Sequence, residues 1–180
     1  MGTVSEIFHY ATFDTSLPVG RLTLAASSRG LAVLSFRGIE EFKESVHFAN
    51  VEWMESKQEV QAYFDQANRY LRGESRDLTM KLDLRGTEFQ RKCWAALLQI
   101  PYGETRSYAD IAEAVECPKG FRAVGLANNR NPVAIVVPCH RVIETNGKLG
   151  GYGGGLPAKE WLLKLEGAPV RRVQQLAFSG

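Results

Sequence analysis

Residues 131–143 read NPVAIVVPCHRVI, an apolar and largely β-branched run with two prolines and a Cys-His-Arg group near its end. Such a run predicts a buried extended segment, because β-branched side chains pack well in strands and prolines interrupt helices. Adjacent side chains of an extended segment point to opposite sides. We therefore expect Cys139 and His140 neither to touch directly nor to share a metal ion, and a bridging water would connect them better.

The residues after this run predict a loop and a final helix. Residues 150–155 are all glycine except Tyr152, which indicates a loop. A helix over residues 157–166 is predicted by Pro157 in its first turn and a glycine just past its end. Glu166 in the last turn opposes the helix macrodipole at a cost of roughly 0.3–1 kcal/mol, so it either orients another group, such as a histidine, or is an ordinary exposed glutamate. Its position alone slightly favours the exposed glutamate.

The residues before the run predict three helices. Thr87 and Gln90 form a capping-box pattern at the start of the first one. A second short helix begins near Ser107, and a third covers about residues 121–129 after a Pro/Gly turn. Two short helices joined by a tight turn are typical of a helix-turn-helix, which presents its second helix to a DNA groove. Taken alone, the pattern favours plain helical packing.

The first part of the chain predicts a small sheet and one helix. Residues 12–36 contain short, partly alternating apolar runs separated by Pro/Gly/Ser turns, which indicates antiparallel strands. Apolar residues recur at spacings of three and four over residues 57–71, and Gly73 follows, so an amphipathic helix is expected there. A further strand is predicted over residues 78–84.

The composition changes at Arg85, where we place a domain boundary. Residues 1–85 hold 10 Lys and Arg against 12 Asp and Glu, a net charge of −2, whereas residues 86–180 hold 12 against 8, a net charge of +4. A local basic excess suits a surface that faces phosphates. The predicted fold class is α+β: an antiparallel-sheet and helix domain over residues 1–85, then a mostly helical domain with a helix-turn-helix over residues 86–180.

The overall composition excludes several classes of protein. A hydrophobic fraction of 44% allows a packed core and excludes disordered and collagen-like chains. No apolar stretch approaches the roughly 20 residues that a transmembrane helix needs. The three cysteines are an odd number without a CxxC pair, so neither a disulfide framework nor a thiolate zinc site is indicated. We expect a monomer in the reducing cytoplasm, without membrane association.

Cys139 is the candidate nucleophile. A thiolate is polarisable enough to attack a saturated alkyl carbon near neutral pH, but an ordinary thiol with a pKa near ~8.5 needs activation. A cysteine in an apolar run is commonly just a small buried side chain, and Cys93 on its helical face has that interpretation. Cys139 differs because His140 and Arg141 follow it directly.

Several motifs together resemble the O6-alkylguanine-DNA alkyltransferase family. They cover essentially all of residues 86–180 in the family's order, and the string PCHRV at 138–142 is the most specific. The others are Ser107-Tyr108, Arg122-Ala123-Val124-Gly125, Asn131-Pro132, and Lys159-Glu160-Trp161-Leu162-Leu163 with Glu166-Gly167. Residues 1–85 match more loosely the family's ribonuclease H-like first domain. Some relatives bind zinc there, but this part has no cysteine and only His9 and His47, so we expect no metal and no cofactor.

The resemblance implies a direct-reversal DNA repair activity. Cys139 would attack the alkyl carbon of O6-alkylguanine in one displacement, while His140 takes the thiol proton through a water and Glu166 holds the imidazole. Tyr108 would hydrogen-bond the guanine ring and protonate it. Asn131 would tie the recognition helix to the active-site segment, although an Asn-Pro turn explains it as well. The alkyl group would stay on the cysteine, so each molecule would react once.

The resemblance also implies how double-stranded DNA with an alkylated guanine is bound. The nucleotide would be flipped out of the duplex, with Arg122 filling the vacated stack, although a surface arginine at a helix start is the simple alternative. Three small residues would let the helix approach the minor groove. These are Ala123, Gly125 and Ala127. Backbone groups at Cys139 and Val142 would hold the exocyclic amine, and the amide of Gly153 would face O6. Tyr152 and Gly154 would complete the pocket, and O4-alkylthymine is a second candidate substrate.

Serine is frequent in relatives at position 153. The glycine here keeps the amide and loses a side chain, so we expect a roomier pocket or a less ordered loop.

Other function classes are separated by particular features. A cysteine hydrolase would also use Cys, His and an acid, but it would turn over, whereas a thioether has no easy route back to the thiol. The glycine-rich loop lacks the G-x-G-x-x-G spacing of nucleotide-binding loops. Some relatives have lost the reactive cysteine and only mark lesions, but Cys139 is present here.

Overall fold

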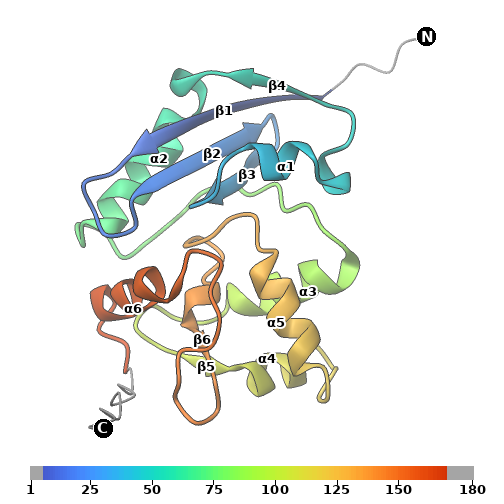
Figure 1. Cartoon of the computed structure of the whole chain (residues 1–180), viewed down its shortest axis with the longest axis vertical. Coiled ribbons are helices and arrows are strands. Elements are labelled where there is room, and N and C mark those ends of the chain that lie inside the picture. The colour runs from blue at the N-terminus through green and yellow to red at the C-terminus, as the bar shows by residue number, and fades with distance from the viewer. Residues whose placement is uncertain (1–5, 170–180) are drawn as a thin grey trace, which may run out of the picture.

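The computed structural model describes residues 6–169, which form a sheet layer packed on a helical layer (Figure 1). The sheet has the order β3-β2-β1-β4, with β1 at Glu6–Asp14, β2 at Arg21–Ser27, β3 at Gly30–Ser35 and β4 at Val51–Glu55. The first three strands pair antiparallel, as the alternating runs predict. The short helix α1 (Glu40–Lys43) and a 3-10 turn at Val46–Phe48 lie between β3 and β4.

The expectation of a purely antiparallel sheet is wrong, because β4 pairs parallel to β1. The chain leaves β3, crosses over through α1 and returns beside β1 at the opposite edge of the sheet. A parallel partner needs such a crossover connection, and the local sequence pattern does not show it. The fold class remains α+β, with a mixed sheet.

Helix α2 (Lys57–Leu71) has the predicted limits and packs against β1 and β2. Its buried face includes Val60, Ala67 and Tyr70. On the same side, Phe64 stacks on Phe13 of β1 with ring centroids 4.0 Å apart. The buried face is the one that the spacing of apolar residues predicts.

The strand predicted over residues 78–84 is wrong in detail, since this segment forms only one bridge, between Leu82 and Leu31. The bridge has two backbone hydrogen bonds, from Leu31 N to Lys81 O and from Asp83 N to Leu31 O. Gly30 allows this close approach, because a Cβ there would lie 2.7 Å from the carbonyl carbon of Lys81 and its φ is +143°. One edge contact is too little for a regular strand.

The second half contains α3 (Glu88–Leu97), α4 (Tyr108–Ala114), α5 (Phe121–Asn129) and α6 (Leu156–Leu165). Thr87 and Gln90 form the predicted capping box of α3, and Ser107 and Asp110 form a second one at α4. Helices α4 and α5 pack together as the helix-turn-helix predicts. The two-residue strands β5 (Arg106–Ser107) and β6 (Val142–Ile143) pair parallel and join the start of α4 to the Cys139 segment.

Residues 131–143 are buried almost throughout but do not form the single extended segment that we expected. Val133 bridges to Leu34 of β3, and a turn with Ile135 at φ +73° then brings Val137 back beside Ala134. A 3-10 turn follows at Cys139–Arg141. The β-branched pattern predicts burial, but the pattern does not show a turn closed by a few hydrogen bonds.

One hydrophobic core joins the two layers of Figure 1. Among others, it includes Leu24 and Leu34 from the sheet, Trp94 from α3 and Val137 beside the cysteine segment. No helix within residues 6–169 is long and apolar enough to cross a membrane.

Candidate active site

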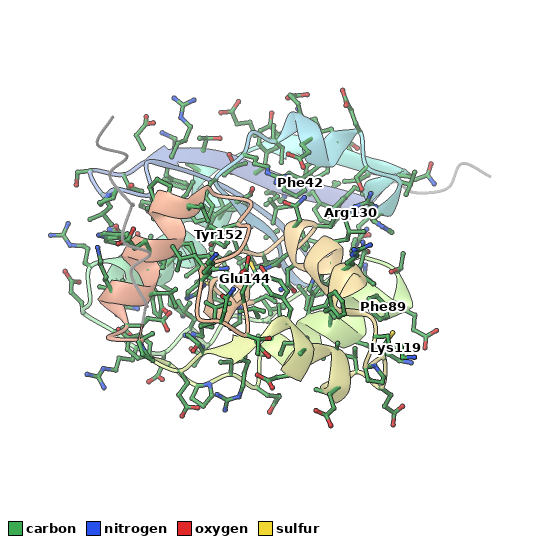
Figure 2. All side chains as sticks on the ribbon, turned by 60° about the horizontal axis from the view of Figure 1, so that its bottom comes forward. Phe42, Phe89, Lys119, Arg130, Glu144 and Tyr152 are labelled. Atoms are coloured by element: carbon green, nitrogen blue, oxygen red, sulfur yellow. The ribbon has the colours of Figure 1, made fainter. Side chains whose placement is uncertain are left out.

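Cys139 lies at the base of a cavity of about 340 Å³ and is 6% exposed. Tyr108 of α4, Arg122 and Gly125 of α5, and the loop 150–153 form the cavity walls. Glu144 and the loop residue Tyr152 also line this cavity. Figure 2 shows both between α5 and α6. A second, smaller cavity of about 40 Å³ reaches Cys139 from the side of the sheet.

Asn131 holds the cysteine directly. Its Nδ2 donates to the Sγ of Cys139 at 3.1 Å and to the carbonyl of Val137 at 2.8 Å, and its Oδ1 accepts from the amide of Val133. Burial raises the pKa of Cys139, and the Asn131 hydrogen bond with the nearby Lys159 charge partly offsets this. The thiol is therefore neutral at rest, and two groups are placed to stabilise its anion.

His140 is fully buried, and its Nε2 lies 2.5 Å from Oε1 of Glu166. Burial lowers the pKa of His140, and the hydrogen bond to Glu166 only partly reverses this shift. A neutral imidazole beside a carboxylate carries its proton on Nε2, which leaves a lone pair on Nδ1. That Nδ1 is buried and has no hydrogen-bond partner within residues 6–169. His140 is thus a base with its free nitrogen available.

Glu166 is the C-cap residue directly after α6, is 6% exposed and accepts hydrogen bonds from several donors. Besides His140, these are Arg141 Nε at 2.8 Å, the Gly103 amide at 3.1 Å and the hydroxyl of Tyr70. Burial raises the pKa of Glu166, but the hydrogen bonds and the charge of its neighbours lower it to about 2. The interpretation of Glu166 as an exposed residue is wrong, and its alternative role, orienting a histidine, matches the geometry.

Tyr70 and Arg141 are site residues for which the sequence suggested no role. Tyr70 lies on α2, and its hydroxyl contacts both Glu166 and Nη2 of Arg141. In the sequence it is one of the apolar positions that define the buried face of the helix. Arg141 also donates to the Ile100 carbonyl at 2.6 Å. No local signal reveals the Tyr70 contact, because the partners are 96 residues apart.

Lys159 is a third residue whose role the sequence did not reveal. It is 0% exposed, and its Nζ donates to the carbonyls of Val142 at 2.6 Å and Gly151 at 3.3 Å. Burial lowers the pKa of Lys159 to about 8. The buried residues Leu162, Leu163 and Glu166 follow at spacings of three, four and seven, so helical periodicity could have placed Lys159 on the inner face. A carbonyl has two lone pairs, so Val142 can still accept another donor.

Tyr108 and the glycine loop close the cavity. The Tyr108 hydroxyl donates to the Gly151 carbonyl at 3.3 Å, and a Cβ on Gly150 would lie 3.0 Å from that hydroxyl. A Cβ on Gly153 would lie 3.1 Å from Nη2 of Arg37, and one on Gly154 would lie 2.8 Å from Cε2 of Phe36. The end of the Arg37 side chain, from the first half of the chain, thus lies next to Gly153, and the roomier pocket or less ordered loop stays a prediction.

Helix α5 presents the residues expected to face DNA in different ways. Arg122 and Ala123 are exposed, and Arg122 has no hydrogen bond or ion pair with another described residue. Gly125 is half-buried, and a Cβ there would lie 3.9 Å from the Tyr108 ring. Ala127, by contrast, is 3% exposed, and its carbonyl accepts from the indole of Trp94. The side chain of Ala127 is therefore in the core and not on the exposed face.

The site has no metal centre in the part of the chain that the structure describes, since no group of three or more His, Cys, Asp or Glu side chains there could hold an ion. The chemistry available is that of a thiol, an imidazole, a carboxylate and a phenol gathered around one cavity. These groups can generate a thiolate, accept its proton and donate a hydrogen bond to a leaving group.

Comparison with known proteins gives one family for both halves. Residues 8–84 match the family model described as "6-O-methylguanine DNA methyltransferase, ribonuclease-like domain", and residues 88–168 match the one described as "6-O-methylguanine DNA methyltransferase, DNA binding domain". Two curated relatives are each named "Methylated-DNA--protein-cysteine methyltransferase". The protein from Mycobacterium tuberculosis is 48% identical and covers 89% of this chain and 93% of its own. The protein from Methanosarcina acetivorans is 47% identical and covers 89% and 99%.

Solved structures agree. A structure titled "Crystal structure of Mycobacterium tuberculosis OGT in complex with DNA" superposes with a TM-score of 0.76 at 48% identity, covering 89% of this chain and 95% of that one. A methyltransferase from the archaeon Pyrococcus kodakaraensis, at 24% identity and a TM-score of 0.62, shares the fold. The chain therefore belongs to the 6-O-methylguanine DNA methyltransferase family.

Proposed function

We propose that this protein repairs double-stranded DNA by direct reversal, moving the alkyl group from O6 of guanine to the sulfur of Cys139. Two hydrogen bonds at the base of the cavity carry the proposal. Asn131 donates to the sulfur of Cys139, and the next residue, His140, is hydrogen-bonded to Glu166. Family membership supports the same activity. O4-alkylthymine carries an alkyl group on a comparable exocyclic oxygen and is a second candidate substrate.

The reaction is a single displacement. The thiol proton passes to Nδ1 of His140 through a bridging water, and the thiolate attacks the alkyl carbon. A sulfur–carbon bond forms, the carbon–O6 bond breaks, and its electron pair goes to the purine. Tyr108 donates a hydrogen bond to the ring and supplies a proton, which His140 later replaces. The products are a thioether and unmodified guanine, so the protein reacts once.

Burial determines when the proton moves from Cys139 to His140. Because burial raises the pKa of Cys139 and lowers the pKa of His140, both groups are neutral in the folded protein near neutral pH. The ionised Glu166 stabilises the imidazolium once it forms, and Lys159 and Asn131 stabilise the thiolate. We infer that the charged pair forms mainly when the substrate is in place.

The alkyl group of a base inside a duplex is hidden from the cavity, so the nucleotide must be rotated out. Arg122 is exposed at the cavity rim on α5, where it can fill the stack that the base leaves. Ala123 and Gly125 allow close approach of this helix to the minor groove. The Gly153 amide, Tyr152 and Gly154 belong to the loop that would enclose the base.

We propose that residues 86–180 carry the DNA-binding and acceptor functions, while residues 1–85 support them. Tyr70 and Arg37 supply that support, since they contact Glu166 and Asn129 across the layers. We also propose a monomer that works in the cytoplasm, because a reducing compartment keeps Cys139 as a thiol.

Intact-mass measurement tests the proposal. After mixing with excess duplex that contains O6-methylguanine, the protein should gain one methyl group, and the peptide with Cys139 should carry it. Cys139→Ala should gain none. The matched control Cys117→Ala removes a half-buried cysteine outside the cavity and should react normally. An unchanged wild-type mass, a methylated Cys139→Ala, or consumption of many equivalents per molecule would refute the proposal.

A further inference from the structure

Phe121 at the start of α5 exposes an aromatic ring at the mouth of the reactive cavity. It is 51% exposed and lines the cavity together with Arg122, the residue that follows it. Within residues 6–169 the ring belongs to neither hydrophobic cluster and contacts no other aromatic ring. The other end of α5 is joined to the sheet layer by Asn129 and Arg37, so Phe121 lies at the end of α5 that points away from that layer (Figure 1).

The position of Phe121 distinguishes it from other exposed apolar side chains, which are common in folded proteins. Successive helical residues point about 100° apart, so Phe121 and Arg122 leave α5 in different directions. Phe121 shares a helical face with Gly125, four residues later, and a Cβ on Gly125 would lie 3.9 Å from the Tyr108 ring. The ring of Phe121 therefore continues the cavity wall outward from Tyr108 to the mouth.

The same position places the ring against DNA. Under the proposed function Arg122 reaches into the duplex, so the residue directly before it must lie at the DNA surface. The small residues Ala123 and Gly125 allow close approach of α5, but a phenylalanine in the first turn would hold the helix away from the minor groove unless its ring enters the DNA. Proteins that bind the minor groove frequently insert apolar side chains between bases.

A flipped nucleotide leaves apolar surface for such a ring to cover. Rotation of the lesion out of the duplex uncovers one face of each of the two flanking bases. The guanidinium of Arg122 is smaller than the purine that it replaces, so it covers these faces only in part. An aromatic side chain can cover more of them, because every base has a face on which a ring can stack.

We propose that Phe121 is a second inserted residue, whose ring packs on a base that flanks the vacated position, beside the guanidinium of Arg122. The contact stabilises the duplex with its nucleotide flipped out. Phe121 is then a positioning residue, which touches neither the alkyl group nor the sulfur of Cys139. This inference rests on the proposed function and extends the insertion from one side chain to two.

Single-turnover alkyl transfer tests the proposal with two substrates, a duplex that contains O6-methylguanine and the free base O6-methylguanine. Phe121→Ala should slow transfer from the duplex about 10-fold, as expected for the loss of one stacked base. The reaction with the free base should keep its rate, because no flanking base is present. Phe121→Tyr keeps the ring and should keep both rates. Equal slowing of both reactions by Phe121→Ala would place the ring on the base inside the cavity and overturn the proposal.

A fluorescent base reports the contact directly. 2-Aminopurine is bright when unstacked and dim when stacked, and it can replace the flanking base on either side of the lesion in two separate duplexes. These duplexes are saturated with Cys139→Ala, which binds without reacting. Adding Phe121→Ala to this protein should brighten the probe in the duplex whose flanking base the ring covers. Unchanged fluorescence in both duplexes would overturn the proposal.

Leu98→Ala is the matched control for the loss of exposed apolar surface. Leu98 is 41% exposed at the end of α3 and lines neither cavity, so this variant should keep both rates. Because the Phe121 ring is half exposed and lies outside the core clusters, the Tm of Phe121→Ala should stay within about 2 °C of the wild type. A larger fall in Tm with slowing of both reactions would show a structural role instead.

The outcomes distinguish this inference from the function on which it rests. If the wild type takes no methyl group from the duplex, the proposed function fails. If the wild type reacts and Phe121→Ala reacts with the duplex at the same rate, the ring does not stabilise the flipped state and only this inference fails.

Discussion

Replacing Tyr70 by phenylalanine removes one hydroxyl at the junction of the two layers. Tyr70 is 1% exposed, so water cannot take the place of the hydroxyl, and both Glu166 Oε1 and Arg141 Nη2 lose a partner. A buried hydrogen bond to a charged group contributes about 1.5–3 kcal/mol. We therefore expect the free energy of unfolding to fall by that amount and the Tm to fall by about 3–12 °C. Urea and thermal denaturation measure both.

The same variant should shift the pH profile of alkyl transfer. Tyr70 is one of the donors that lower the pKa of Glu166 to about 2, so its loss makes this carboxylate more basic. A more basic carboxylate holds the proton on His140 more strongly and raises the pKa of the imidazole. Because the proposed mechanism needs neutral His140, the acid limb of the single-turnover rate should move to higher pH.

Tyr102→Phe is the matched control. The rings of Tyr102 and Tyr70 lie 5.8 Å apart, but the Tyr102 hydroxyl donates to the Leu165 carbonyl and not to the carboxylate. It should lose some stability and keep the wild-type pH profile. An unmoved acid limb in Tyr70→Phe, or an equal shift in Tyr102→Phe, would refute the idea that Tyr70 tunes the relay.

Three further changes have defined outcomes. Arg122→Ala should slow repair of duplex DNA more than reaction with the free alkylated base, because only the duplex has a vacated stack to fill. Equal slowing of both reactions in single-turnover assays would exclude the proposal that Arg122 fills the stack. Glu166 has a folded pKa of about 2 against an ordinary value of 4.5, so its stabilisation is complete above about pH 5 and is lost as the pH falls toward 2. Over that pH range the free energy of unfolding of the wild type should therefore fall by about 3 kcal/mol more than that of Glu166→Gln. The same pH dependence of unfolding in both proteins would contradict this. Gly154→Ala places a Cβ against the Phe36 ring and should slow alkyl transfer. Adding Phe36→Ala to this variant should restore part of the rate. If the double variant is as slow as Gly154→Ala, the clash is not the cause.

Elements that depend only on neighbouring residues could be predicted from the sequence. The spacing of apolar residues predicts α2 with its observed limits, and the capping box at Thr87 marks the start of α3. Capping and periodicity act within one or two turns of a helix, so they can be read locally. The Cys139-His140 pair could be recognised for the same reason, because its members are adjacent.

The way in which distant segments meet could not be predicted from the sequence. The parallel pairing of β4, the turn that presents Cys139 and the contact of Tyr70 with Glu166 depend on the folded arrangement of the whole chain. Asn128 is a further case. In the sequence it is one asparagine in a short helix, and only the packing of α5 against the rest of the protein shows that its side chain is buried. Burial depends on which distant segments cover the helix, and no local pattern shows that.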